Sequence, residues 1–354
     1  MLLPVRRAIL SVSNAGESKG SRKAYERSFF AGSNDSTLPR SLERFEAIAL
    51  PARQPLAKAG GKQAWSRRPA PWPAGRVPAW QAVRMPLRYA IHVPTFAEPD
   101  VLVDLAVTAE GRGWDGFLLW DHILGSREMR FPIVDSWVAL GAIAYATTRI
   151  KIGTAITPVP RRRPWKLARE VTTLDRLSRG RAILGVGLGT PIDAEYGTFG
   201  EPTDPRILAE RLDEGLEIVD GLLSGEPVHH AGAHYRVDGA VFLPRPVQRP
   251  RVPIWVACSW PHRRPLARAA RWDGVIMLQM NSADELVPIG SDEVAEAAAR
   301  IRRVPTAQSP YDVAVVLPGL PPDPAGLEEA GATWVLVTGW LNDLPRIIAA
   351  GPPI

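Results

Sequence analysis

Cysteine is almost absent from this chain, since Cys258 is the only one among 354 residues. This count excludes an internal disulfide and any metal site built from several cysteines, and it fits a reducing cytoplasm. No apolar run approaches the roughly 18 residues that a transmembrane helix needs, and the apolar patch near Ile9 is too short for a signal peptide. We therefore predict a cytoplasmic protein without a membrane partner.

An excess of positive charge is missing from most of the chain, although the formal net charge is +6. Residues 1–84 hold 15 lysines and arginines against 5 acidic residues, whereas residues 85–354 hold 28 against 32. The basic character therefore belongs to the first 84 residues. Because that stretch lacks the interleaved aromatic and basic residues of a single-strand binder, nucleic acid is not an expected partner.

Residues 1–84 also lack a sustained hydrophobic period, and they are rich in Ser, Arg, Pro and Gly. Such a composition predicts a disordered extension. At Met85 the pattern changes to an apolar strand followed by a helix, and strand-like and helix-like segments then alternate. We predict one domain over 85–354, and we interpret Met85 as a candidate true start of translation.

Eight apolar segments in this domain are typical of buried strands. They cover 87–93, 116–120, 149–156, 181–187, 252–257, 273–278, 311–317 and 333–338, mostly with helical segments between them. Eight such units in about 250 residues predict an α/β fold of the (β/α)8 TIM-barrel class. An open doubly wound sheet is the alternative, but Gly185, Gly187 and Gly189 lie too late in the chain for a dinucleotide fingerprint.

Polar residues gather at the carboxyl ends of the predicted strands, where barrels carry their chemistry. These ends hold His92, Thr95, Asp121, His122, Thr154, Thr157, Gly189, Thr190, Cys258 and Gln279. Asp121 and His122 directly follow an apolar strand, so an imidazole that exchanges a proton near neutral pH would lie at the barrel mouth. The residues alone leave a second interpretation open, in which Asp121 caps the next segment and His122 is a packed polar residue.

Three other functional interpretations of polar residues have weaker support. His229, His230 and His234 have a spacing that loosely suggests metal ligands, but no carboxylate or cysteine cluster supports them, so no metal is predicted. The arginines 161–163 follow a strand and could meet an anion, or form a solvated turn. A hydrolytic barrel that uses Asp121 and Glu195 is disfavoured, because no second carboxylate lies at a strand end.

A set of segments then carries a family resemblance. The segments are 120–122 (WDH), 153–158, 177–189, 212–218, 224–228, 234–235, 244–256 and 269–274. In order and spacing they resemble the bacterial luciferase-like flavin-dependent oxidoreductases, over essentially 85–340. The resemblance implies a luciferase-like TIM barrel that binds a flavin-type ring at the strand ends. The ring would be FMN, supplied in reduced form by a reductase, or the deazaflavin coenzyme F420.

The resemblance also implies a cofactor site. A bulge in the third strand would carry a non-proline cis peptide at Ala155–Ile156. The ring would contact Thr154 and Thr157, and Gly187 and Gly189 would leave space for it. Its ribityl chain would lie near Thr190 and Asp193. The phosphate would be held by Ala257, Cys258 and Ser259, with Arg263 or Arg264. This loop departs from the consecutive glycines that are common in the family, which leaves the phosphate contacts open.

The implied chemistry centres on His122, with Asp121, as acid and base beside the ring. The main prediction is an FMN-dependent monooxygenase that uses reduced flavin and oxygen on a small organic substrate. An F420-dependent hydride-transfer oxidoreductase is the alternative, and a non-catalytic flavin-binding protein is the second. His92, Trp260 and Tyr196 are the candidate walls of a substrate pocket, together with Trp340. A homodimer is common in the family, but the sequence does not reveal the oligomeric state.

Overall fold

Eight parallel strands close into a barrel in the computed structural model, which describes residues 86–128, 130–282, 285–304 and 310–353. The extension predicted over 1–84, and Met85, lie outside the described residues. The barrel strands are β1 (Arg88–Val93), β2 (Gly116–Leu119), β3 (Lys151–Pro158), β4 (Ala182–Gly187), β7 (Ile254–Ser259), β8 (Gly274–Met280), β10 (Asp312–Leu317) and β11 (Trp334–Thr338). All eight predicted strands are present, with bounds that differ by two residues or fewer.

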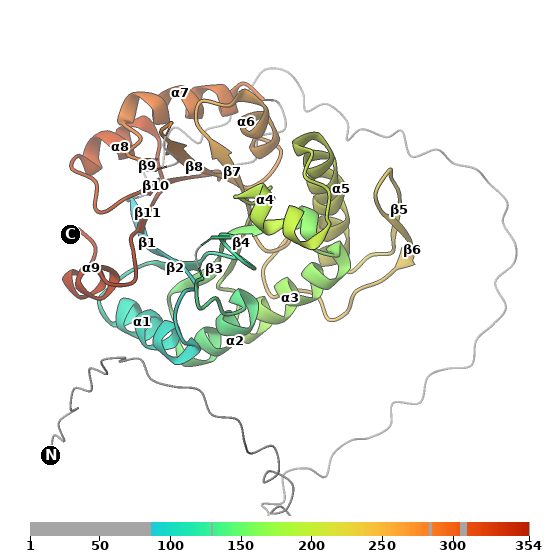
Figure 1. Cartoon of the computed structure of the whole chain (residues 1–354), viewed down its shortest axis with the longest axis horizontal. Coiled ribbons are helices and arrows are strands. Elements are labelled where there is room, and N and C mark those ends of the chain that lie inside the picture. Colours follow the sequence, from blue (N-terminus) through green and yellow to red (C-terminus); the bar gives the residue numbers. More distant parts are fainter. Residues whose placement is uncertain (1–85, 129, 283–284, 305–309, 354) are drawn as a thin grey trace, which may run out of the picture. The chain divides into compact units, whose positions relative to one another are not determined.

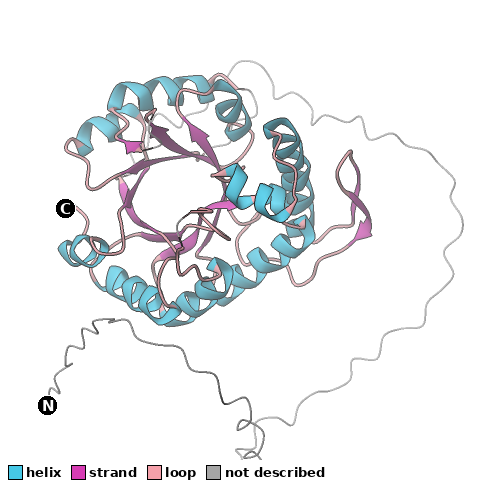
Figure 2. Ribbon diagram, in the orientation of Figure 1, coloured by secondary structure: helices cyan, strands magenta, loops and turns pink. Residues whose placement is uncertain are grey.

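Pairing around the barrel follows the order β10, β11, β1, β2, β3, β4, β7, β8, and β8 pairs again with β10. This closure confirms the TIM-barrel prediction and excludes the open doubly wound sheet. Figure 1 shows the strands as a ring with the helices outside it, and Figure 2 separates the two layers by colour.

The helices follow the strands that they cover. They are α1 (Pro99–Gly111), α2 (Ser136–Ala146), α3 (Pro164–Leu177), α4 (Ile192–Glu195), α5 (Pro205–Ser224), α6 (Arg263–Ala269), α7 (Ser291–Arg302), α8 (Pro324–Ala330) and α9 (Leu344–Ala350). Short 3-10 turns cover Val159–Arg161 and Gly197–Phe199, and a hairpin of β5 (Val228–Ala231) and β6 (Arg236–Ala240) follows α5. The short strand β9 (Leu286–Val287) pairs antiparallel with β8. In the described ranges, no helix has the length and apolar character to cross a membrane.

Local sequence explains where these helices begin and end. The Asp135 carboxylate accepts a hydrogen bond of 2.8 Å from the Val138 N–H, which caps the start of α2. Asp204 caps α5 in the same way through the Arg206 N–H, and Pro205 occupies the first helical position. Gly225 ends α5 at a φ of 80°, in the left-handed region that glycine tolerates.

Two hydrophobic cores result from the alternation of side chains along the strands. A smaller cluster fills the barrel interior, where the rings of Trp255 and Trp334 lie 5.5 Å apart. A larger cluster joins the outer faces of the strands to the helices. Because the interior is filled by side chains, the barrel is a packed support, and open space lies beyond the strand ends.

Candidate active site

The segment after β2 brings a histidine to the barrel mouth. The Trp120 N–H continues the strand pairing by donating to the Val93 carbonyl at 2.9 Å, and the Ser136 hydroxyl donates to the Trp120 carbonyl at 2.6 Å. Both bonds are made by the backbone of Trp120, so they fix the chain directly before the next two residues. The His122 side chain retains 21% of its exposure, so it remains accessible at the mouth.

Glu195 is the partner of this histidine. His122 Nδ1 lies 3.1 Å from Glu195 Oε1, and the Glu195 side chain is fully buried. The same carboxylate accepts hydrogen bonds from the backbone N–H groups of Ile123, Leu124 and Gly125, at 3.1, 3.2 and 2.8 Å. An ionised carboxylate accepts only, so Nδ1 must carry the proton and donate. In the neutral imidazole, Nε2 is then the nitrogen that can accept a proton as a base.

Glu195 is held in its ionised form by this environment. Burial alone raises the pKa of a carboxyl group. The hydrogen bonds from His122 and Gly125, together with the charge of Arg161, outweigh burial and lower the pKa of Glu195 from 4.5 to about 2. The carboxylate therefore stays charged near neutral pH and keeps the proton of His122 on Nδ1.

Two arginines after β3 complete the charge network. Arg161 is nearly fully buried, and it donates to the Glu195 carboxylate and to the backbone carbonyl of Asp121. Arg162 Nη2 lies 2.8 Å from both carboxylate oxygens of Asp121. Asp121, which the family resemblance placed beside His122 as its acidic partner, has its carboxylate bound by arginine instead. Asp121 thus anchors the segment, while Glu195, 73 residues away, orients the imidazole.

His92 links the end of β1 to the bulge in β3. Its Nε2 donates to the Ala155 carbonyl, and the Thr338 hydroxyl donates to the His92 carbonyl at 3.0 Å. Burial lowers the pKa of His92 to about 4; the bond to Ala155 opposes this shift, and the charge of His122 adds to it. His92 is therefore neutral near pH 7, and its hydrogen bond to Ala155 holds the end of β1 against the bulge in β3.

The bulge in β3 has the backbone that the resemblance implied. The peptide bond Ala155–Ile156 is cis, and the pairing of β3 with β4 shifts between Thr154 and Thr157. The Thr154 hydroxyl donates to the Gly185 carbonyl at 3.1 Å, and the Thr157 hydroxyl donates to that of Thr154 at 3.0 Å. Both threonines are fully buried. Their donors are thus used inside the sheet, and the half-buried Ile156 presents its side chain at this strand end.

The glycines of β4 permit close approaches of the neighbouring strands. A Cβ on Gly185 would overlap the Thr154 carbonyl. A Cβ on Gly187 would lie 3.1 Å from the Ile156 side chain and 3.3 Å from the Ala257 side chain. Gly189 has a φ of 85°, which favours glycine, and a Cβ there would lie 2.8 Å from Pro158. Glycine at these positions therefore lets β3 and β7 pack closely against β4 and the residues that follow it.

The residues after β4 differ in their access to the mouth. Thr190 and Asp193 are exposed, and the Asp193 carboxylate lies 2.9 Å from Arg127 Nε. Tyr196 is fully buried, and its hydroxyl donates to the Leu188 carbonyl. Burial is the main cause that raises the pKa of Tyr196. The Tyr196 ring therefore supports this loop and does not line open space, in contrast to its predicted place in a substrate pocket.

The residues that were predicted to contact the phosphate lie at the carboxyl end of β7 and at the start of α6. Ala257 and Ser259 are half-buried, whereas Arg263 and Arg264 are exposed at the start of α6. Cys258 is fully buried, and burial raises the pKa of its thiol to about 12, which makes it inert as a nucleophile. Trp260 is buried, with the Arg300 guanidinium 5.4 Å from its ring, so it packs in the core rather than lining the mouth.

An aromatic cluster beside His122 contains Trp340, which was predicted as a pocket wall, and Phe96 and Phe131, which were not predicted. The rings of Phe96 and Phe131 are stacked at 4.3 Å, and the ring of Trp340 lies 6.4 Å from that of Phe96. Trp120 and Phe96 lie 5.6 and 6.2 Å from the imidazole of His122. Trp340 is 59% exposed, which is unusual for a large apolar ring. The position of Phe96, just beyond a strand end, was the available signal.

Buried polar atoms without partners mark the mouth as a site for a polar ring. Within the described part of the chain, His92 Nδ1, Thr95 Oγ1 and Trp120 Nε1 are buried and have no hydrogen-bond partner. Such atoms are costly unless a ligand or water satisfies them. Their place at the carboxyl ends of β1 and β2 fits a planar cofactor with polar substituents. No group of three or more His, Cys, Asp or Glu side chains in these ranges is arranged to hold a metal ion.

Comparisons with known proteins agree with this architecture. The model of the family described as luciferase-like monooxygenase matches residues 83–321. An F420-dependent glucose-6-phosphate dehydrogenase of Nakamurella multipartita is 32% identical over 213 residues, which are 59% of this chain and 62% of that protein. A protein of the same name from Microbacterium testaceum is 34% identical over 170 residues, 48% of this chain and 50% of that protein. The chain thus matches about half to three fifths of these curated relatives.

A solved structure supports the fold alone. The coenzyme F420 dependent tetrahydromethanopterin reductase of Methanopyrus kandleri superimposes with a TM-score of 0.60 at 19% identity. The match covers 75% of this chain and 97% of that chain.

Proposed function

Because the chain belongs to the luciferase-like monooxygenase family, we propose that it is an F420-dependent oxidoreductase acting on a small organic alcohol or carbonyl compound. The observation that carries this proposal is the His122–Glu195 pair at the barrel mouth. The names of the curated relatives favour F420 over the FMN monooxygenase that was the main prediction. This proposal needs no flavin reductase as a partner. The cytoplasmic location and the homodimer stay predictions.

The proposed reaction divides into a hydride and a proton. Coenzyme F420, when bound, would accept a hydride from the substrate carbon or return it. His122 Nε2 takes the proton from the substrate hydroxyl as the carbon loses its hydride, and the product is a carbonyl compound. In the opposite direction, His122 gives that proton back to the carbonyl oxygen. Proton transfer by a positioned side chain typically contributes roughly 10²- to 10⁴-fold to a rate.

Glu195 makes this proton transfer possible without reacting itself. Its negative charge stabilises the imidazolium that forms when Nε2 is protonated. Its bond to Nδ1 also holds the ring in one orientation, with Nε2 free. Arg161 neutralises part of the Glu195 charge and keeps the carboxylate in place. The non-catalytic alternative does not require such a tautomer-selecting pair.

We infer that the substrate is uncharged in the part that lies against His122. Phe96, Phe131 and Trp340 form an aromatic wall beside the imidazole. The two arginines of the His122 network are both bound by carboxylates, so neither offers a free charge to a phosphate. An apolar wall excludes water and favours an apolar substrate over a sugar phosphate.

Titration of the purified chain with F420 and with FMN tests the cofactor. We expect tight F420 binding, seen as quenching of protein fluorescence, and weak FMN binding. Tight FMN binding without F420 binding would return the monooxygenase prediction to first place. With F420 bound, reduction of F420 by a series of apolar alcohols, compared with glucose 6-phosphate, tests the substrate class.

A further inference from the structure

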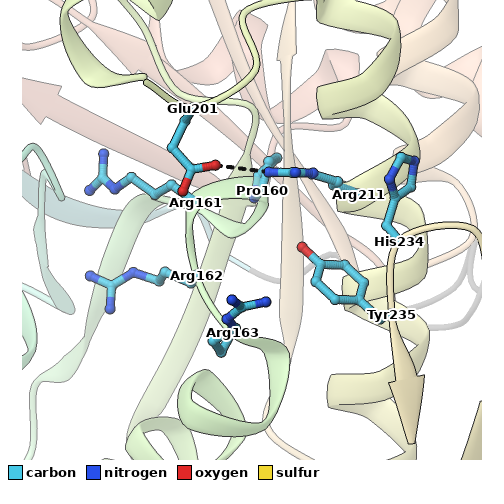
Figure 3. A pocket seen from close by; sticks show the side chains of 8 residues that line it. All are labelled: Pro160, Arg161, Arg162, Arg163, Glu201, Arg211, His234 and Tyr235. Atoms are coloured by element: carbon cyan, nitrogen blue, oxygen red, sulfur yellow. Dashed lines mark hydrogen bonds and ion pairs between the residues drawn. The ribbon is translucent and has the colours of Figure 1, made fainter. Parts of the chain in front are cut away.

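A cavity of ≈ 120 Å³ lies outside the barrel mouth, between the turn before α3, helix α5 and the loop of the β5–β6 hairpin. Figure 3 shows its lining, which is dominated by arginine. Neither the predicted cofactor contacts nor the aromatic wall uses the side of the cavity formed by Arg163, Arg211 and Tyr235. The proposed oxidoreductase activity therefore leaves this cavity unexplained.

The cations of the cavity are not all neutralised. Arg161 and Arg162 are bound by the carboxylates of the His122 network. Arg163 is exposed, and its side chain has no hydrogen-bond or ion-pair partner among the residues that the structure describes. Arg211 has an ion pair of 3.1 Å with Glu201, whose side chain is 44% exposed. Exposed pairs of this kind are weak, so Arg211 can exchange this partner for another anion.

The hydroxyl of a largely buried tyrosine faces the same space. The Tyr235 residue is only 8% exposed, and its hydroxyl oxygen is not among the buried polar atoms that lack a partner in the described ranges, so it is open to a ligand. In Figure 3 this hydroxyl points between the guanidinium groups of Arg163 and Arg211. Burial raises the pKa of Tyr235, although the charges of Arg211 and Arg163 oppose the shift. The hydroxyl is therefore a protonated donor near neutral pH.

The start of α3 adds to this set of donors. Arg163 is the N-cap residue of this 14-residue helix, and it makes no side-chain capping bond. The positive end of the helix dipole thus lies beside two guanidinium groups and one hydroxyl. The groups that converge are donors or cations, whereas the acidic lining residue, Glu201, is already engaged by Arg211. An oxyanion is the ligand that complements such a set.

We propose that this cavity binds a small oxyanion, a phosphate or a carboxylate group, through Arg163, Arg211 and the Tyr235 hydroxyl. The anion can come from solution or from the acidic end of a larger ligand that reaches over from the mouth. The two sources share one chemistry, and competition with the cofactor separates them.

The test uses inorganic phosphate and the full chain. Phosphate, compared with chloride at equal ionic strength, is expected to raise the thermal midpoint and to show a saturable Kd by calorimetry. Arg163→Gln and Tyr235→Phe are each expected to weaken phosphate binding, Arg163→Gln by roughly tenfold or more. Arg346→Gln, at an exposed arginine on α9, is the matched control and should bind as the wild type does. Circular dichroism without phosphate checks that each variant is folded.

Two outcomes overturn the proposal: equal effects of phosphate and chloride on the wild type, or undiminished phosphate binding by folded Arg163→Gln. If phosphate binds, an F420 titration at saturating phosphate identifies the source. A raised apparent Kd for F420 assigns the cavity to an acidic end of the cofactor, whereas an unchanged Kd assigns it to a free anion. Because phosphate binding is measured without F420, a failure of the F420 proposal does not affect this result.

Discussion

Two networks, each built on a buried arginine and its carboxylate partners, lie at opposite ends of the barrel. At the amino ends of the strands, Arg251 binds Asp273, which precedes β8. At the carboxyl ends, Arg161 binds Glu195 and approaches Asp121. Both arginines are largely buried, and both depend on carboxylates from distant parts of the chain. Both networks therefore pair arginine with carboxylates, but they serve different purposes.

The two networks differ in whether they include a side chain that can exchange a proton. At the amino end, Asp273 also accepts the Ile254 N–H at 2.7 Å, and Asp220 takes the Arg251 Nε–H. Burial would lower the pKa of Arg251, but Asp273 and Asp220 outweigh it and raise the pKa. The carboxyl-end network instead includes His122, with one nitrogen free and the side chain partly exposed. The amino-end network is closed in the sense that each of its ions is paired, although Asp220 is 47% exposed, and such a network stabilises the fold. A network that ends in an accessible imidazole can move a proton.

Loss of the His122 imidazole should have the largest effect on activity. His122→Ala is expected to lower kcat for F420-dependent turnover by roughly 10²- to 10⁴-fold, because the base is lost. The Kd for F420 should change little, which fluorescence titration measures. His229→Ala, at an exposed histidine of the β5–β6 hairpin, is the control. Near wild-type kcat in His122→Ala would exclude the histidine as the base.

Breaking the closed network should cost stability and leave chemistry intact. Arg251→Met is expected to lower the free energy of unfolding by about 3–5 kcal/mol, because Asp273 is left as an uncompensated charge. Denaturant unfolding measures the loss, and kcat per folded molecule should stay within about twofold of the wild type. If stability were unaffected but kcat fell, the contrast between the two ends would be wrong.

Glu195 should also contribute to acid stability. Its pKa is lowered in the folded state to about 2, so its contribution is present above about pH 4.5 and is lost as the pH falls toward 2. In Glu195→Gln, this contribution, on the order of 3 kcal/mol, should be absent near pH 7, and stability should depend less on pH from 4.5 to 2. Urea unfolding across this range measures it, with the exposed Glu226→Gln as control. An unchanged pH dependence in Glu195→Gln would contradict the role of the buried carboxylate.

The aromatic wall should give the smallest effect. Phe96→Ala is expected to raise KM for an apolar substrate by roughly three- to tenfold, because it removes a stacked contact of about 0.5–1.5 kcal/mol. The kcat value should change less than KM. Phe199→Ala, at an exposed phenylalanine, is the control for steady-state kinetics. A fall in kcat with KM unchanged would place Phe96 in support of His122 rather than against substrate.

The alternation of strand-like and helix-like segments made the barrel predictable, whereas local features shifted the ends of single strands. The third strand was predicted over 149–156 but covers Lys151–Pro158, because its pairing with β4 resumes after the bulge, at Thr157 and Pro158. The family resemblance supplied the cis peptide, since no residue-level rule favours one before isoleucine. Tyr196 and Trp260 were placed in a substrate pocket from their size and position alone, and the structure buries both.

The amino-acid pattern by itself determined the barrel, the order of its strands and the placement of His122 at a strand end. These follow from short apolar runs and turn residues, which act over a few positions. Only the tertiary structure decided that Glu195, and not the adjacent Asp121, holds the imidazole. It also placed Tyr235 between Arg163 and Arg211. The physical reason is that an ion pair or hydrogen bond requires contact within about 3–4 Å, which depends on how loops from different strands converge.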